Sequence, residues 1–209
     1  MRFLYFLGSI PILLMSIVFI ILSPRIRMEY KLVNNAIENH PRSSFEDLLT
    51  DLLIAAEDHR YMSHFGFDHI AIVRAIFRTL ILRKVEGAST IEQQLVRTVT
   101  KKYGISLKRK IEEISISLLI SINNNKSDIA YTYLSVAFFG YNSVGYKSAS
   151  KMLIIDDSLA DSVVLQGAAI VALLKRPMPS RKNESWKNLH KGRKYHIVNR
   201  YNTLILNGG

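Results

Sequence analysis

The chain has 209 residues, which is enough for one domain with an appendage and a sizeable hydrophobic core. Its 28 Lys and Arg residues outnumber its 17 Asp and Glu residues, and the net charge of +11 favours an anionic partner such as nucleic acid, an acidic lipid surface or a phosphate-bearing substrate. The chain contains no Cys, so disulfide bonds and thiolate-bound metals are excluded.

Residues 3–24 carry no charged side chain and predict a transmembrane helix, because a helix of this length crosses a hydrocarbon core of about 30 Å. A cleaved signal peptide is the alternative, but the apolar stretch is longer than a typical signal-peptide core and lacks an Ala-x-Ala-like cleavage site. Basic residues flank the stretch on both sides, so the positive-inside rule does not orient the body. We therefore divide the chain into a transmembrane anchor (1–27), a polar connector (28–44) and a body (45–209).

The pattern of apolar residues beyond the connector predicts a mainly α body. Ser43-x-x-Glu46 and Ser89-x-x-Glu92 are capping-box signatures, and each is expected to begin a helix. No series of alternating strands is visible. Further helices are predicted over residues 107–122, 127–139, 158–175 and 187–206.

The run from Glu57 to Asp68 gathers acids, two histidines and three aromatic residues within twelve positions. Glu57 is expected at the end of a helix, where the helix dipole and apolar neighbours disfavour a charged carboxylate and suit it to proton transfer. The alternative is a polar helix end in which Asp58 and His59 satisfy backbone groups. A metal site of His59, His64 and Asp68 is a third interpretation, but the spacing matches no standard ligand pattern.

The segment from Gly87 to Arg97 brings a glycine, two hydroxyl groups and two amides to the start of a helix. Unpaired N–H groups at a helix N-terminus bind anions or hydroxyl groups readily. The simpler interpretation is that Ser89 or Thr90 only caps the helix, and capping does not exclude contact with a ligand.

A basic cluster opens the next helix. Arg109 lies four residues before Glu113 and shares its helix face, and Lys110 lies three residues before Glu113. An exposed ion pair in this orientation contributes roughly a few tenths of a kcal/mol, so a solvated charged face is the simpler interpretation. A basic cluster that holds a carboxylate would instead suit a diphosphate leaving group.

The three motifs, taken in this order, resemble those of the family 51 glycosyltransferases. They read Glu-Asp-x-x-(Phe/Tyr)-x-x-His-x-Gly-x-Asp from Glu57, Gly-x-Ser-Thr-Ile-x-Gln-Gln-Leu from Gly87, and Arg-Lys-x-x-Glu from Arg109. These enzymes are peptidoglycan polymerases, found as monofunctional transglycosylases and as the N-terminal domain of class A penicillin-binding proteins. The resemblance covers about residues 48–206 and leaves no stretch for a penicillin-binding domain, so we expect the monofunctional type.

The resemblance implies a lysozyme-like, mainly α glycosyltransferase domain behind a single N-terminal transmembrane helix. It implies that Glu57 is the general base that deprotonates the 4-hydroxyl of the acceptor sugar. That oxygen then displaces undecaprenyl diphosphate from the donor chain with inversion. Glu113 is expected to organise basic groups or a divalent ion around the diphosphate, and residues 65–86 would form a membrane-associated jaw.

The resemblance also implies the cofactors, partners, location and substrate-binding residues. No cofactor is required and no metal ligand set is expected, although a divalent cation (Mg²⁺ or Mn²⁺) at the diphosphate is left open. The expected partners are lipid II, the growing glycan chain, the membrane, and transpeptidase and division or elongation proteins. The expected location is the bacterial inner membrane, single-pass, with the catalytic domain on the periplasmic side. The expected substrate-binding residues are Asp58, His64, Ser89, Thr90, Gln93, Gln94, Arg97, Arg109 and Lys110.

Two departures from the family pattern keep other functions open. Ile105 stands where the family has a basic residue, so Lys101, Lys102 or Lys108 would have to compensate, and Ser135 replaces the Asn of a Tyr-Leu-Asn motif. They motivate a catalytically weak, membrane-bound scaffold of the cell-wall machinery as an alternative. A lysozyme-like glycan hydrolase is another, but it leaves the basic cluster unexplained. Nucleic-acid binding is not favoured, because the chain has a predicted anchor and no matching motif.

Overall fold

The structure, a computed structural model, describes residues 2–40, 46–83, 87–154 and 162–206. It divides into two compact units: unit 1 contains Met1–Asn39 and Arg60–Ile129, and unit 2 contains His40–His59 and Ala130–Gly209. The predicted cap Ser43, residues 84–86 of the predicted jaw and residues 158–161 of a predicted helix lie outside the described residues.

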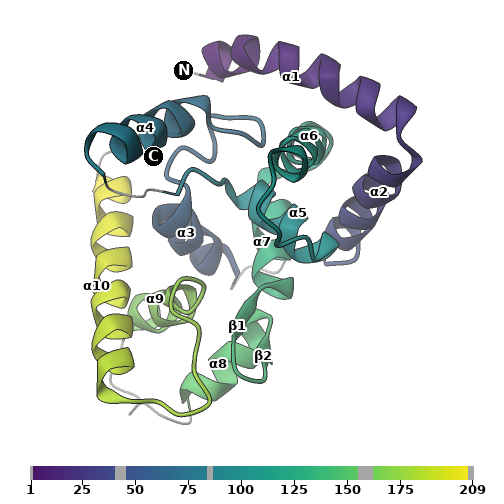
Figure 1. The fold of residues 1–209 in the computed structure, drawn as a ribbon. Coiled ribbons are helices and arrows are strands. Elements are labelled where there is room, and N and C mark those ends of the chain that lie inside the picture. The colour runs from purple at the N-terminus through teal and green to yellow at the C-terminus, as the bar shows by residue number, and fades with distance from the viewer. Residues whose placement is uncertain (1, 41–45, 84–86, 155–161, 207–209) are drawn as a thin grey trace. The chain divides into compact units, whose positions relative to one another are not determined.

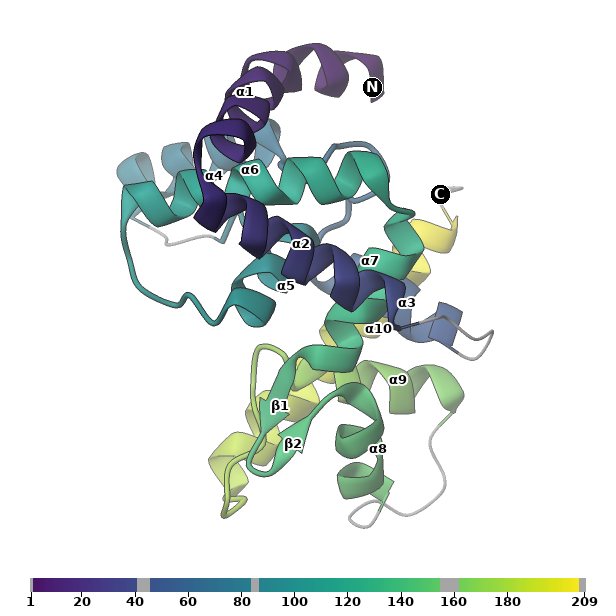
Figure 2. The same ribbon diagram turned by 90° about the vertical axis from the view of Figure 1, so that its right-hand side faces the viewer.

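Unit 1 is built from helices, three of which pack against α6. Its elements are α1 (Arg2–Leu22), α2 (Pro24–Glu38), α4 (His69–Ile81), α5 (Ile91–Thr100), α6 (Leu107–Asn123) and the first residues of α7 (Lys126–Val136). α6 contacts α1, α2 and α5, and α2 lies across α5 and α6 (Figure 2). Val33 of α2, Leu95 of α5 and Ile116 of α6 are buried, and each side chain contributes about 1.5–3 kcal/mol relative to an exposed one.

α1 agrees with the predicted transmembrane helix. Its segment Tyr5–Leu22 is long and apolar enough to cross a membrane, and only 17% of this segment is buried inside the structure. The outward-facing side chains are almost all apolar, as a lipid-facing helix requires.

The predicted polar connector contains a helix that the sequence pattern did not indicate. α2 begins at Pro24 after the N-cap Ser23, whose hydroxyl accepts a hydrogen bond from the backbone N–H of Ile26. Ile26, Val33 and Ile37 are its buried residues. They lie seven and four residues apart, which places them on one narrow face. Charged and amide side chains between them conceal this face in the sequence.

Unit 2 contains the second set of helices. Its elements are α3 (Glu46–Glu57), the end of α7, β1 (Phe138–Gly140), β2 (Ser143–Val144), α8 (Tyr146–Ile154), α9 (Val163–Ala172) and α10 (Glu184–Leu206). α3 contacts both α9 and α10 (Figure 1). Gly167 permits the close approach of α9 to α3, because a Cβ atom there would lie 2.7 Å from Leu52 Cδ1. These contacts hold the end of α3, where Glu57 lies.

The helix predicted over 127–139 was only partly correct. α7 ends at Val136 and is followed by the antiparallel pair β1 and β2. Gly140 has a φ of +138° and lies against the backbone of Met178, and the N–H of Tyr141 donates to the Met178 carbonyl at 2.7 Å. Strands of three and two residues are too short to show an alternating pattern, which is why the sequence did not predict them.

Gly66→Ala tests the packing of the loop before α4. The φ of Gly66 is +73°, and a Cβ atom would lie 2.2 Å from the carbonyl oxygen of Ser117 in α6. We expect the substitution to lower the free energy of unfolding by at least about 2 kcal/mol, measured by denaturant titration in detergent. Gly104→Ala is the control, because its Cβ would meet no atom within 4 Å. Equal stability of the two variants would contradict this account of the loop.

Candidate active site

The loop from Arg60 to Asp68 is held in unit 1 by its own charged and aromatic residues. Asp68 is the N-cap of α4, where its carboxylate accepts from the backbone N–H of Ala71 at 2.8 Å, and it forms an ion pair with Arg60 at 2.7 Å. Tyr61 and His64 are buried and meet edge to face, with ring centroids 6.0 Å apart. Asp68, considered above as a metal ligand, is therefore engaged in a helix cap and an ion pair.

The carbonyl oxygen of Gly66 joins this loop to α5. It accepts hydrogen bonds from the Thr90 hydroxyl at 2.9 Å and from the Gln93 side-chain amide at 3.3 Å. Thr90 is also the N-cap of α5, and its hydroxyl accepts from the backbone N–H of Gln93. Of the two caps considered from the sequence, Thr90 is confirmed, and the capping box that begins at Ser89 is wrong. Thr90 and Gln93 are almost completely buried, and their side chains fix the loop to the start of α5.

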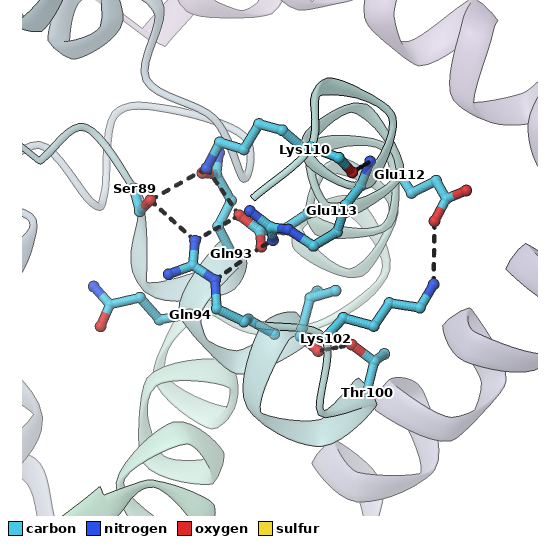
Figure 3. A network of polar contacts seen from close by, with 12 residues as sticks. Ser89, Gln93, Gln94, Thr100, Lys102, Lys110, Glu112 and Glu113 are labelled. Atoms are coloured by element: carbon cyan, nitrogen blue, oxygen red, sulfur yellow. Dashed lines mark hydrogen bonds and ion pairs between the residues drawn. The ribbon is translucent and has the colours of Figure 1, made fainter. Parts of the chain in front are cut away.

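Glu113 is the centre of a cluster of basic side chains (Figure 3). Its Oε1 atom accepts from Arg97 at 2.9 Å and from Lys110 at 2.8 Å, and its Oε2 atom accepts from Arg97 at 3.0 Å and from Arg109. Glu113 is buried, whereas the three basic side chains keep 18–30% of their surface exposed. The cluster therefore exposes parts of three cationic side chains around a buried carboxylate.

The second and third sequence motifs meet in this cluster. Lys110 donates to the side-chain oxygen of Gln93 at 2.6 Å and to the Ser89 hydroxyl at 3.2 Å, and Arg97 donates to Ser89 at 3.3 Å. Because Gln93 also donates to Gly66, a chain of hydrogen bonds runs from the loop after Glu57 to Glu113. Ser89 is thus a contact of the basic groups rather than a helix cap.

Burial and charge act in opposite directions within the cluster. Burial raises the pKa of Glu113, but hydrogen bonds from Arg97 and Lys110 outweigh it, and the pKa lies below its usual value. Burial lowers the pKa of Lys110, and contact with Glu113 only partly offsets this. Three cationic groups around one carboxylate leave an excess of positive charge, which suits the binding of a polyanion such as diphosphate.

The surroundings of Glu113 do not fit a directly bound divalent cation. Both carboxylate oxygens already accept hydrogen bonds from basic groups, and three cationic side chains stand within hydrogen-bonding distance. A metal ion prefers oxygen ligands without competing cations. Arg97, Arg109 and Lys110 are thus the positive charges next to this carboxylate.

Glu57 lies in unit 2, at the C-terminal end of α3. Arg193 of α10 donates to its Oε1 atom at 2.7 Å and to the Ala56 carbonyl at 3.0 Å. About a sixth of each side chain remains exposed. Asp58 follows as a buried residue whose N–H donates to the Ile54 carbonyl. The carboxylate of Glu57 is therefore held by an arginine from a distant helix of the same unit.

Arg193 is a functional candidate that sequence reasoning missed. It lies 136 residues after Glu57 along the chain. α10 carries basic residues along much of its length, so no local spacing distinguishes Arg193 from its neighbours.

Lys126 is a second residue whose contacts the sequence did not indicate. It forms an ion pair with the fully buried carboxylate of Glu92, and its ammonium lies 4.3 Å from the centre of the Tyr61 ring. Burial raises the pKa of Glu92, but the charge of Lys126 outweighs burial and lowers it. The capping-box pattern gave Glu92 a helix-end role, and only the fold brings it to a lysine 34 residues away.

The connection between α5 and α6 contains the unusual residue Ile105, which is fully exposed. Of the lysines considered as replacements, Lys102 donates to Glu29 of α2 at 2.6 Å and to Glu112 at 3.1 Å. Lys101 and Lys108 are exposed. Lys102 is therefore engaged with two carboxylates next to the Glu113 cluster.

Comparison with known families gives the identity of the fold. A family model described as Transglycosylase matches residues 30–202. The chain belongs to the transglycosylase family. This membership confirms the resemblance seen in the three motifs and the prediction of a mainly α, lysozyme-like domain.

Individual relatives are penicillin-binding proteins. Penicillin-binding protein 1A of Rickettsia typhi is 34% identical over 164 residues, which cover 77% of this chain and 21% of the relative. Penicillin-binding protein 1A of Vibrio cholerae is 36% identical over 130 residues (62% and 16%), and penicillin-binding protein 1F of Bacillus subtilis is 31% identical over 128 residues (61% and 18%). The chain thus spans about a fifth of the length of these relatives.

Glu113→Gln tests the buried carboxylate through stability. The folded-state pKa of Glu113 lies below its usual value of 4.5, so the ionised group stabilises the fold above that pH, and the contribution is lost as the pH falls. We expect the variant to lose roughly 3 kcal/mol of unfolding free energy at neutral pH. Its stability should also vary less than that of the wild type between about pH 5 and pH 3.

Denaturant titration at several pH values measures both effects. Glu184→Gln is the matched control, because Glu184 is an exposed acid at the start of α10. A pH dependence in Glu113→Gln as steep as in the wild type would show that the ionisation of Glu113 does not support the fold.

Proposed function

We propose that the protein is a peptidoglycan glycosyltransferase that polymerises lipid II and releases undecaprenyl diphosphate. The observation that carries this proposal is the cluster of Arg97, Arg109 and Lys110 around buried Glu113, which offers preorganised positive charge for a diphosphate leaving group. Membership of the transglycosylase family supports the same class of reaction.

The chemistry follows from the two carboxylates. Glu57, positioned by its ion pair with Arg193, accepts the proton of the 4-hydroxyl of the acceptor sugar. The oxygen attacks the anomeric carbon of the donor as the bond to the diphosphate breaks, so the configuration inverts. The departing diphosphate takes the bonding electron pair, and the basic cluster stabilises the negative charge that develops. Glu113 acts by holding these cations in position.

The membrane is the source of the substrate in this proposal. α1 supplies an apolar helix of spanning length. Several large apolar side chains of α4 are exposed, and only Ala71 and Ala75 are buried. An exposed apolar face with Arg74 and Arg78 among its residues suits insertion at a lipid interface, as expected of the jaw. The exposed apolar residues of α4 include Ile70, Val73, Ile76, Phe77, Leu80 and Ile81.

The proposed location is the inner membrane of a bacterium, with the catalytic body on the extracytoplasmic side. Lipid II and the growing glycan are the proposed substrates, and transpeptidases and division or elongation proteins are the proposed partners.

Glu57→Gln is the primary test. With purified protein in detergent and lipid II as substrate, we expect glycan formation to fall by about 10²-fold or more, because the base is lost. Binding of lipid II should stay near the wild-type level, because Gln keeps the shape of the side chain. Gel analysis of radiolabelled glycan and a separate binding assay measure the two quantities, and Glu184→Gln is the control.

Two results would overturn the proposal. Wild-type protein that binds lipid II but forms no glycan would indicate a scaffold. Shortening of preformed glycan strands without use of lipid II would indicate a hydrolase.

Arg109→Ala tests the diphosphate contact. Loss of one charge-assisted hydrogen bond should weaken the binding of undecaprenyl diphosphate by roughly tenfold. The difference between variant and wild type should shrink as the salt concentration rises, because salt screens the missing charge. Calorimetry at several salt concentrations measures this, with the exposed Lys191→Ala as the control. A difference that does not change with salt would argue against a phosphate contact.

A further inference from the structure

The connection between α5 and α6, together with the first residue of α6, exposes large apolar side chains at three alternate positions of the sequence. Tyr103 is 64% exposed, Ile105 is fully exposed and Leu107 is 78% exposed. In Figure 2 the connection lies at the left of the view and runs from the end of α5 to the N-terminal end of α6. Exposed apolar residues grouped in this way indicate an interaction surface.

The protein holds both ends of this connection in place. Lys101 adopts a left-handed conformation with a φ of 55° and caps α5, and Lys102 is bound to Glu29 and Glu112. At the other end, the hydroxyl of Ser106 accepts from the backbone N–H of Arg109 and caps α6. The segment that carries the apolar side chains is therefore fixed to the protein at both ends.

The charge around the apolar residues identifies the partner. Lys101 and Lys108 are exposed on either side of Tyr103, Ile105 and Leu107. Exposed apolar side chains flanked by lysines bind well at the surface of an anionic bilayer, where the apolar groups enter the lipid and the lysines contact the headgroups. The spanning helix α1 belongs to the same unit and would keep the connection close to a bilayer.

We propose that residues 101–108 form a lipid-binding loop that inserts Tyr103, Ile105 and Leu107 into an anionic membrane surface. It is a lipid contact in addition to α4, and it does not depend on transferase activity. Ile105 thereby has a role of its own: a residue that replaces a basic family position becomes a lipid contact. Lys102 then serves to anchor the loop through Glu29 and Glu112.

The absence of Cys from the chain makes a site-specific test direct. Ile105→Cys is labelled with a fluorophore, and the full chain is reconstituted in vesicles of phosphatidylethanolamine and phosphatidylglycerol that contain a nitroxide-labelled lipid. Asn39→Cys is the matched control, because Asn39 is exposed, polar and part of the same anchored unit. Circular dichroism and thermal unfolding establish that both labelled proteins are folded.

We expect the lipid-attached nitroxide to quench the probe at position 105 severalfold more strongly than the probe at position 39. Replacing phosphatidylglycerol with phosphatidylcholine should reduce quenching at position 105, because Lys101 and Lys108 lose their anionic partner. Equal quenching at both positions would overturn the proposal, since tethering alone would then explain the signal. Quenching at position 105 that is unchanged in neutral vesicles would overturn the anionic character of the surface. Because lipid II turnover is measured separately, these results are independent of the proposed function.

Discussion

The ion pairs of the buried Glu113 are the interaction on which the basic cluster of unit 1 depends. A single buried carboxylate brings together two arginines and a lysine that would otherwise repel one another. Burying Glu113 costs free energy, and the hydrogen bonds from these cations offset the cost. The three cations exceed the single negative charge of Glu113, so the cluster keeps an excess of positive charge. A buried acid thus determines where this positive charge lies on the protein.

The same cluster is linked to the rest of unit 1 through short polar connections. Gln93 uses one end of its amide for Lys110 and the other for the Gly66 carbonyl, so the cluster and the loop after Glu57 share one buried side chain. Gly66 in turn lies against the backbone of α6 at a distance that no side chain would permit. On the side of α2, Lys102 joins Glu29 to Glu112, the residue that precedes Glu113. Lys102 therefore links the start of α6 to α2, the helix that follows the apolar α1.

Unit 2 also contains an ion pair between a carboxylate and a distant basic residue. Glu57 lies at a helix end that disfavours negative charge, and Arg193 supplies the opposite charge from α10. α10 reaches this position because α3 packs against both α9 and α10, with Gly167 allowing close contact. The position of the proposed base thus depends on helix packing and on one distant arginine.

The mainly α class, the long apolar helix near the N-terminus and the start of α6 could be predicted from the sequence, because each depends on local composition and helical spacing. The family resemblance, rather than the spacing alone, implied that Arg97, Arg109 and Lys110 share a basic site with Glu113. Only the tertiary structure decided that Thr90 caps α5, that residues 24–38 form a helix, and that Glu57 pairs with Arg193 and Glu92 with Lys126. Local pattern reports which face of an element is apolar, but it carries no information about which distant charge will neutralise a buried one. That choice is made when helices far apart in the chain pack together, since a buried carboxylate is stable only where the fold brings a cation within hydrogen-bonding distance.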